Sequence, residues 1–331
     1  SPVSAADRYV ANSVLATGRW AKIRVPKTGI YRLSEDVVRR AGFSDINKVK
    51  IYGYGGALQN ETLREEDIIE TDDLKEVPTC IVEGKRLFHA QGPVSWSSNT
   101  VNRRTRNPYS DYGYYFLTET SDEPLTVDSL TFVDSFYPSA DDYHTLHEID
   151  NYAWYHGGRN LFENSPIEKG KSKTYTLVTP KGDGSGKRVV YVVATTGTHT
   201  TFEIAVNGET KGTYSHSFTV YDHGKATEAY YEIPEVGDTT TVTLTTISGG
   251  PVLLDHISIC QTTPRARPQL ASSVFDTPEY VYNITNQNHH ADGPADMIII
   301  IPASAKLLTQ AQRLKEAHET HDGMRVRIVP A

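Results

Sequence analysis

The chain has 331 residues, with 33 Lys and Arg against 41 Asp and Glu and a formal net charge of −8. This length is enough for two or three domains with sizeable cores. The negative charge argues against nucleic acid as a main partner, and no apolar run reaches the roughly 18–20 residues that a membrane-spanning helix requires.

Residues 1–120 are predicted to form an N-terminal α+β module that is rich in strands. Residues 20–25 alternate apolar and polar side chains, as a half-buried strand does, and residues 30–33 return as a second strand after a turn. Ser34 has the character of a helix N-cap, and Gly42 that of a helix stop. These features predict two strands separated by a turn and followed by one short helix.

A glycine-rich turn and a polar loop follow in the same module. Residues 49–52 read as a third strand, closed by Gly53-Tyr54-Gly55-Gly56, whose glycines permit positive φ and a close approach of another backbone. Residues 96–108 read as a long polar loop. It contains an arginine cluster that we interpret as solvated rather than as a phosphate site: Arg103, Arg104 and Arg106.

Residues 121–268 are predicted to form an antiparallel, jelly-roll-like β-sandwich. Short runs with strand character recur at near-regular spacing, and Asn207-Gly208 is a strong signal for a two-residue hairpin turn. The predicted strands include 172–178, 188–194, 201–206, 229–233, 240–246 and 253–259. The two cysteines, Cys80 and Cys260, fall in predicted strands, so we favour two buried free thiols over a disulfide.

Residues 269–331 are predicted to contain a linker and one strand–helix–strand unit. The strand covers 296–301, the helix 303–321 and the second strand 324–329. Parallel strands need helices on both faces and further strands beside them. We therefore expect the incomplete start of an α/β domain, in which Ile298 and Ile300 require cover. The overall fold class is mainly β.

No cofactor or metal is assigned, but one acidic segment contains candidates. His144, His147, Glu148 and Asp150 form the densest group of metal-ligand residue types, although its β character does not favour a zinc site. Calcium bound by loop carboxylates is the alternative. The candidate ligands for it are Asp141, Asp142, Glu148 and Asp150.

Aromatic residues between 96 and 116 define a candidate binding surface. Exposed aromatic rings can stack on sugars, whereas buried ones pack domains together, and the sequence leaves both alternatives open. The residues of this surface are Trp96, Tyr109, Tyr112 and Tyr114. Catalytic residues are predicted to be absent, because neither cysteine follows a parallel strand at whose carboxyl end α/β sheets place reactive groups.

Several segments of the chain together resemble a known family. They are residues 20–33, 49–56, 90–93, 107–117, 158–159, 254–257, 282–285 and 294–301. The chain resembles the N-terminal region of the PorU-like sortases of the type IX secretion system, which belong to the gingipain family of cysteine peptidases. The last of these segments is similar to the opening of the family's caspase-like catalytic domain.

The resemblance implies an exported protein at the periplasm or outer-membrane surface of a Gram-negative bacterium. The family removes C-terminal sorting signals from secreted cargo, so it implies cargo proteins, secretion-system subunits and the chain's own peptidase domain as partners. The family's catalytic His and Cys lie in later strands. No thiol follows Cys260, so this chain is expected to be an inactive, non-catalytic portion. The alternatives are a glycan- or protein-binding sandwich of a cell-surface protein and the pro-region of a gingipain-like protease.

Overall fold

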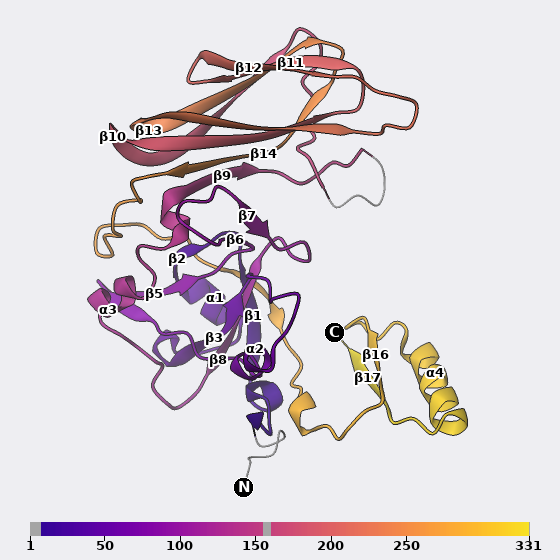
Figure 1. The fold of residues 1–331 in the computed structure, drawn as a ribbon. Helices are drawn as coiled ribbons and strands as arrows, with labels where there is room; N and C mark the ends of the chain where they lie inside the picture. Colours follow the sequence, from indigo (N-terminus) through magenta and orange to yellow (C-terminus); the bar gives the residue numbers. More distant parts are fainter. Residues whose placement is uncertain (1–7, 155–159, 331) are drawn as a thin grey trace. The chain divides into compact units, whose positions relative to one another are not determined.

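The computed structural model describes residues 8–154 and 160–330 and is mainly β, as predicted (Figure 1). The chain divides into two compact units. One consists of the described residues up to Trp20, Leu63–Leu74 and the residues from Ile284 onward. The other, Ala21–Thr62 with Lys75–Asn283, contains both the N-terminal module and the sandwich.

The N-terminal module is built on two small antiparallel sheets. The strands of the first, in spatial order, are β15 (Glu279–Asn283), β1 (Trp20–Val25), β8 (Gly113–Glu119) and β3 (Val49–Gly55). Those of the second are β2 (Gly29–Arg32), β5 (Lys85–Ala90) and β4 (Cys80–Val82). Strand β15 lies within the 269–331 segment, yet it completes the first sheet by pairing with β1.

Three short helices accompany the first half of the chain: α1 (Glu35–Arg40), α2 (Glu65–Glu70) and α3 (Ser129–Asp134). The predicted helix start is confirmed, because the Ser34 hydroxyl accepts a hydrogen bond from the Val37 backbone N–H at 3.3 Å. Helix α1 buries Val37 and Val38 in a core that also contains Ile23 and Ile51 from the first sheet. This short amphipathic helix thereby covers the side of the core against which Val37 and Val38 pack.

Strand β3 continues to Gly55, through most of the segment predicted as a turn, and the predicted close backbone contact there is confirmed. Gly55 has a φ of +77°, and a Cβ there would lie 2.4 Å from the Gln91 carbonyl oxygen. A Cβ at Gly56 would lie 2.7 Å from the carbonyl oxygen of Gly92. A side chain at either position would force two backbone segments apart, so only glycine allows this packing.

We expect Gly55→Ala to destabilise the chain by about 2–3 kcal/mol, because the left-handed backbone is strained for alanine and its methyl group meets a carbonyl. Urea unfolding followed by circular dichroism measures the change. Gly84→Ala is the matched control, since Gly84 also has a positive φ (+70°) but open space around its Cβ position. Equal losses for the two variants would show that the contact with Gln91 is not what requires glycine.

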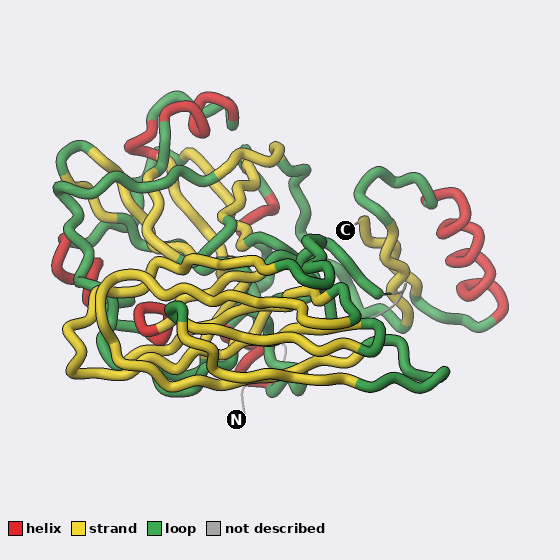
Figure 2. Tube along the Cα trace, turned by 90° about the horizontal axis from the view of Figure 1, so that it is seen from above, coloured by secondary structure: helices red, strands yellow, loops and turns green. Residues whose placement is uncertain are grey.

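The sandwich is one continuous antiparallel sheet folded into two layers. Its spatial strand order is β12 (Glu209–His216), β11 (Thr200–Val206), β13 (Lys225–Ser248), β10 (Ser172–Thr196), β14 (Val252–Gln261) and β9 (His144–Glu148). Strands β10 and β13 are long enough to run through both layers and pair along most of their length. Figure 2 shows the long strands of this part of the chain from above. The runs predicted separately at 172–178 and 188–194 are therefore two halves of β10.

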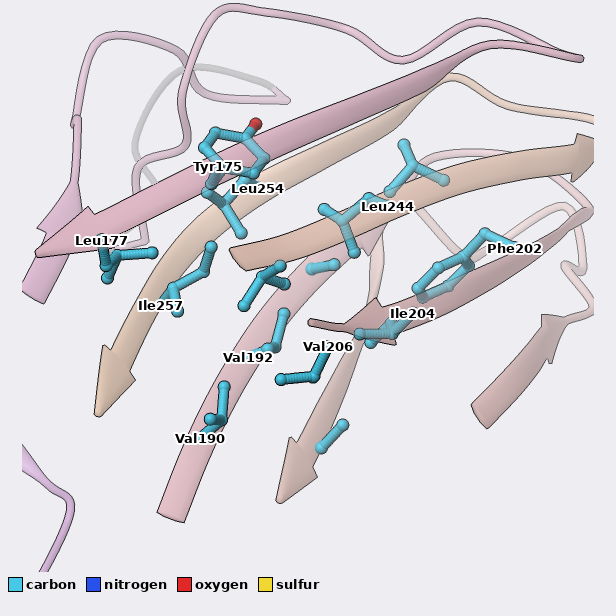
Figure 3. Close-up of a cluster of buried hydrophobic side chains, with 14 of the residues drawn as sticks. Tyr175, Leu177, Val190, Val192, Phe202, Ile204, Val206, Leu244, Leu254 and Ile257 are labelled. Carbon is cyan, nitrogen blue, oxygen red and sulfur yellow. The ribbon is translucent and has the colours of Figure 1, made fainter. Parts of the chain in front are cut away.

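The two layers enclose a core that consists mainly of aliphatic and aromatic side chains. Side chains such as Val190 and Val192 of β10, Phe202 and Ile204 of β11, and Leu254 of β14 are all buried (Figure 3). The Asn207-Gly208 hairpin is confirmed: both residues have positive φ, and β12 begins directly after them.

A buried arginine holds the bend where β10 and β13 pass from one layer to the other. Both strands lose regular pairing there, which leaves carbonyl groups without ladder partners. The Arg188 side chain is completely buried and donates to the carbonyl oxygens of Pro180 at 2.9 Å and Val236 at 2.7 Å. It also donates to the Gly237 carbonyl at 2.5 Å and to the Gln261 side chain at 3.2 Å.

Strand β14 is buried along its whole length because both of its faces are covered. The sandwich core covers one face, and the hairpin of β6 (Val94–Trp96) and β7 (Arg104–Arg106) covers the other. Asn102 is buried there, and its amide donates to the carbonyls of Val189 and Ser258 at 2.8 and 3.0 Å. The long polar loop predicted over 96–108 is confirmed for residues 97–103, but Arg104–Arg106 form strand β7, and Asn102 and Arg104 bind to the sandwich.

The predicted strand–helix–strand unit is present: β16 (Met297–Ile301) and β17 (Val326–Pro330) pair in parallel, and α4 (Leu308–His321) connects them. The helix begins later than predicted, because Ala305 has a positive φ of 55° and the chain turns there. Ile301 is buried, but Ile298 and Ile300 are 62% and 70% exposed. Strand β16 is thus partly covered on the face of Met297, Ile299 and Ile301, whereas Ile298 and Ile300 lack the cover that they were expected to require. Among the described residues, no helix combines the length and the apolar character needed to cross a bilayer.

Candidate functional site

A groove of about 700 Å³ lies between the N-terminal module and the edge of the sandwich. We call it the module–sandwich groove. The N-terminal module contributes the start of β2, His89 of β5 and Trp96 of β6, and the sandwich contributes the edge strand β9. The volume lies within the roughly 300–1,000 Å³ that is typical of ligand sites.

Four of the predicted candidate residues line this groove together: Trp96, Asp141, Asp142 and Glu148. Trp96 stacks on His144 with ring centroids 3.9 Å apart and an interplanar angle of 9°. His89 stacks on Phe136 at 4.2 Å and 9°. His89 and Phe136 also line the groove but were not predicted as site residues, because they lie about fifty positions apart and no local motif links them.

The two aspartates of the groove differ in their partners. Both belong to the 3₁₀ turn η4 (Ala140–Tyr143). The Asp142 carboxylate accepts hydrogen bonds from the Ser139 backbone N–H at 2.7 Å and from its hydroxyl at 3.2 Å, which caps the turn. The Asp141 carboxylate has no hydrogen bond or ion pair within the described part of the chain. Burial, and then the charge of Asp142, raise the pKa of Asp141 to about 6.

The groove's basic groups are largely engaged or neutral. Burial lowers the pKa of His89 to about 4, so its ring is neutral near pH 7. Arg106 is paired with Asp150 at 2.8 Å and Asp111 at 2.9 Å. Arg265 donates to the His144 carbonyl at 2.9 Å and partly offsets the charge of Asp141. Asp141 is thus the acidic group of the groove that has the least compensation.

We expect Asp141→Asn to stabilise the chain at pH 8. The carboxyl pKa is about 6 in the folded state and about 3.9 in the unfolded state, so the folded state binds the proton more tightly. Ionisation therefore costs stability above pH 6, and this cost disappears as the pH falls below about 4. After allowance for solvent screening, the gain at pH 8 is about 1–2 kcal/mol.

Urea unfolding of the wild type and Asp141→Asn at pH 8 and at pH 4 measures this difference. The two proteins should differ at the higher pH and coincide at the lower one. Asp36→Asn is the control, because Asp36 is exposed in the first turn of α1. A stability gain of the same size at both pH values would mean that it does not come from ionisation of Asp141.

A second depression of about 350 Å³ shares Arg106, Asp111 and Glu148 with the groove. Here the Glu148 carboxylate is almost fully buried and is held by the Arg104 guanidinium, with one hydrogen bond at 2.8 Å from Nε and a second, shorter one. Arg104 also lies 3.6 Å from Asp255. The interpretation of the arginine cluster as solvated is therefore wrong for Arg104 and Arg106, which form ion pairs on β7.

The metal candidates divide between these two places. Glu148 lies with Asp255 and His256, and their potential ligand atoms are all within 4.8 Å of one another. Arg104 already supplies positive charge to both carboxylates, so this group resembles an internal ion-pair network more than an empty metal site. Asp141 and Asp142 lie on η4, and Asp150 is bound by Arg106. Calcium binding by these residues stays a prediction.

The four aromatic residues of the predicted binding surface do not lie together in one cavity. Tyr112 and Tyr114 are neighbours at 6.3 Å, but the guanidinium of Arg24 lies 4.1 Å from the first ring and the ammonium of Lys22 lies 4.2 Å from the second. Such cation–π contacts occupy a face of each ring. Tyr109 is 88% exposed beside the second depression. Trp96 and Tyr109 thus line different cavities, and Tyr112 and Tyr114 line neither of them.

Both thiols are free and buried, as predicted. Cys260 lies directly opposite His144 across the β9–β14 pair. However, its Sγ donates to the Asn99 carbonyl at 3.2 Å, and the His144 ring nitrogens contact the carbonyls of Ala140 and Val101 at 2.6 and 3.2 Å. Burial raises the pKa of both thiols. A nucleophilic cysteine needs an accessible thiolate, which these surroundings disfavour.

The described chain is thus a β-rich scaffold in which a strand module, a sandwich and a parallel strand–helix–strand unit follow one another. Among solved structures, it is similar to dimeric latent PorU from Porphyromonas gingivalis, with a TM-score of 0.73 and 23% sequence identity. The match covers 98% of this chain and 38% of that structure. The chain therefore has a PorU-like fold and spans well under half of the protein that it matches.

Other solved structures share only part of the fold. Family 35 carbohydrate-binding modules from Cellvibrio japonicus and Clostridium thermocellum are 18% and 15% identical over 37% and 35% of this chain, and each match covers 87% of the module. Their TM-scores of 0.26 and 0.23 are too low to support an argument. No protein-family model matches the sequence, and no curated protein matches it. The segment Gly158-Arg159 lies outside the described residues, so this part of the resemblance has no structural counterpart here.

Proposed function

We propose that this chain is a non-catalytic portion of a PorU-like sortase of the gingipain family. The observation that carries the proposal is the PorU-like fold over 98% of the chain. The same family was indicated by motifs spread from residue 20 to residue 301. In this proposal the parent protein is exported to the periplasm or outer-membrane surface and processes the C-terminal sorting signals of secreted cargo.

The proposal assigns positioning rather than chemistry to these residues. The module and the sandwich would shape the approach of cargo to the peptidase domain, whose caspase-like sheet would continue from the β16–β17 pair. Support comes from the open face of that pair, where Ile298 and Ile300 are exposed although parallel sheets normally have both faces covered. The burial of both thiols, and the hydrogen bond that the Cys260 thiol donates, support a chain that is inactive by itself.

A peptidase assay tests this assignment. The purified chain is incubated with a peptide that carries a C-terminal sorting signal, with and without iodoacetamide. We expect no thiol-dependent cleavage. Cleavage that iodoacetamide abolishes, and that is lost in Cys260→Ser or Cys80→Ser, would contradict the proposal. In a second arm, the chain should bind the separately produced peptidase domain of its own gene, and the absence of any association would count against the scaffold role.

Glycan binding by the surface around Tyr109 is the second candidate. Its support is the highly exposed ring of Tyr109 next to a depression that also contains Arg106 and Asp150, since exposed aromatic faces stack on sugars. Calorimetric titration with surface polysaccharide tests it. Heat that is lost in Tyr109→Ala but kept in Tyr221→Ala, a control with a similarly exposed ring (86%), would support it. If the titration gives no heat of binding, glycan binding by this surface is excluded.

A further inference from the structure

The module–sandwich groove has the character of a ligand site that none of the roles above uses. Its apolar lining includes Ile30, Trp96, Phe136 and Phe275. Most of the charged groups of its lining are engaged by other residues of the chain, including Lys27, which pairs with Asp276 at 3.4 Å. We propose that the groove binds an extended peptide segment that carries one Lys or Arg side chain between apolar residues.

The charge of the groove selects a cationic side chain. Asp142 is satisfied by Ser139, and Glu148 by Arg104, whereas the Asp141 carboxylate is partly buried without a hydrogen-bond donor in the described chain. A carboxylate in this position gains most from an arriving ammonium or guanidinium group, which forms a charge-assisted hydrogen bond. The neutral ring of His89 does not oppose such a cation. The cations of the lining already have partners: Arg265 donates to the His144 carbonyl, Lys27 pairs with Asp276, and Arg106 pairs with Asp111 and Asp150.

The aromatic lining fits the rest of such a residue. Trp96 and Phe136 each have one ring face stacked on a histidine, at 3.9 and 4.2 Å. These stacked pairs are rigid and flat, and flat aromatic groups bind both apolar side chains and the aliphatic stems of Lys and Arg. The binding surface therefore exists before a ligand arrives, which lowers the entropic cost of binding.

The backbone around the groove favours a peptide over a small amine. Strand β9, which borders the groove, is the outermost strand of its sheet. The outer edge of β2 is already paired with Asp276, whose carbonyl accepts a hydrogen bond from the Arg32 backbone N–H at 2.9 Å. An edge strand such as β9 presents backbone N–H and C=O groups that an extended peptide can pair with. A free amine could satisfy Asp141 but could not use this edge. The inference does not depend on membership of the sortase family.

Fluorescence anisotropy with the full chain tests the proposal at pH 7.5. The probe is a fluorescein-labelled peptide, Ser-Val-Val-Arg-Val-Val-Ser, with a matched peptide in which citrulline replaces arginine. We expect saturable binding of the arginine peptide and at least about tenfold weaker binding of the citrulline peptide. The variant Asp141→Asn should weaken binding of the arginine peptide about tenfold and leave binding of the citrulline peptide unchanged.

The controls make each outcome decisive. Asp141→Asn is expected to fold stably, so a loss of binding cannot be attributed to unfolding, and Asp36→Asn should bind the arginine peptide as the wild type does. Equal affinity for both peptides, or no effect of Asp141→Asn, would overturn the proposal. So would the absence of saturable binding up to about 1 mM. Competition by free arginine amide at the same concentration as the peptide would show a small-cation site and would overturn the assignment to a peptide.

Discussion

Replacement of Arg188 by methionine is expected to lower the free energy of unfolding by about 3–5 kcal/mol. Methionine fills most of the volume of the side chain but cannot donate hydrogen bonds. The carbonyls of Pro180, Val236 and Gly237 would then be buried without partners at the bend of the sandwich. Urea denaturation monitored by circular dichroism measures the loss, which should appear as a lower midpoint with an unchanged slope.

Lys187→Met is the matched control for this experiment. Lys187 is the preceding residue of the same strand, is 67% exposed and pairs only with the exposed Glu232. Its replacement should change stability by less than about 0.5 kcal/mol. A similarly small effect for Arg188→Met would mean that the bend does not need the guanidinium. Water or a relaxed backbone would then satisfy these carbonyls.

The buried ion pair between Arg104 and Glu148 is expected to make the second large contribution to stability, with a strong coupling between the two residues. Arg104→Met removes the closest cation of the buried Glu148 carboxylate, which keeps a longer contact with Arg106 at 3.7 Å, and a neighbouring cation of Asp255; this should cost about 3 kcal/mol. Glu148→Leu removes the main partner of Arg104 and should cost about 2–3 kcal/mol. The double variant should lose much less than the sum. We therefore expect a coupling energy of at least about 2 kcal/mol in a double-mutant cycle.

An exposed ion pair of the same chain provides the comparison. Arg267 and Asp134 lie 2.6 Å apart, with side chains 40% and 55% exposed. The same cycle on this pair should give a coupling below about 1 kcal/mol, because water screens both charges. If the two cycles gave similar values, burial of Glu148 under the β6–β7 hairpin would not strengthen its ion pair with Arg104.

The parts of the fold that local chemistry determines could be predicted from the sequence. Ser34 caps α1, Asn207-Gly208 turns β11 into β12, and the apolar run at 297–301 forms a parallel strand. In each case the signal lies within a few neighbouring residues, so the pattern indicates the structure directly. The glycines at the end of β3 also indicated a close backbone contact, although the sequence did not show that Gln91 and Gly92 would provide it.

Features that depend on distant contacts could not be predicted in this way. The glycine-rich run at 182–186 reads as the end of a strand, yet β10 continues through it because Arg188 holds the irregular bend. The polar hairpin of β6 and β7 reads as solvated, since its side chains find their partners about 50 to 150 positions later in the chain.

The residues of the candidate site also divide into those that a local sequence signal indicates and those that only distant contacts bring together. Trp96, Asp141, Asp142 and Glu148 could be chosen because aromatic and acidic residue types carry a chemical signal. Their common groove could not be foreseen, because it exists only where β9 meets the N-terminal module. His89 carries no sequence signal for this groove, and its place in the lining, stacked on Phe136, is seen only in the structure. Tyr112 and Tyr114 were chosen on the same signal, but Arg24 and Lys22 lie over their rings.

The double cover of β14 limits how this sandwich can be shared among proteins. A gene fragment that began at residue 121 would encode the strands of the sandwich but not the hairpin that shields Ser258 and Cys260. Without the hairpin, the outer face of β14 would expose both apolar side chains and polar groups to water, and the isolated sandwich would tend to aggregate. Recombination is thus expected to transfer residues 94–106 and the sandwich together, as one inherited block.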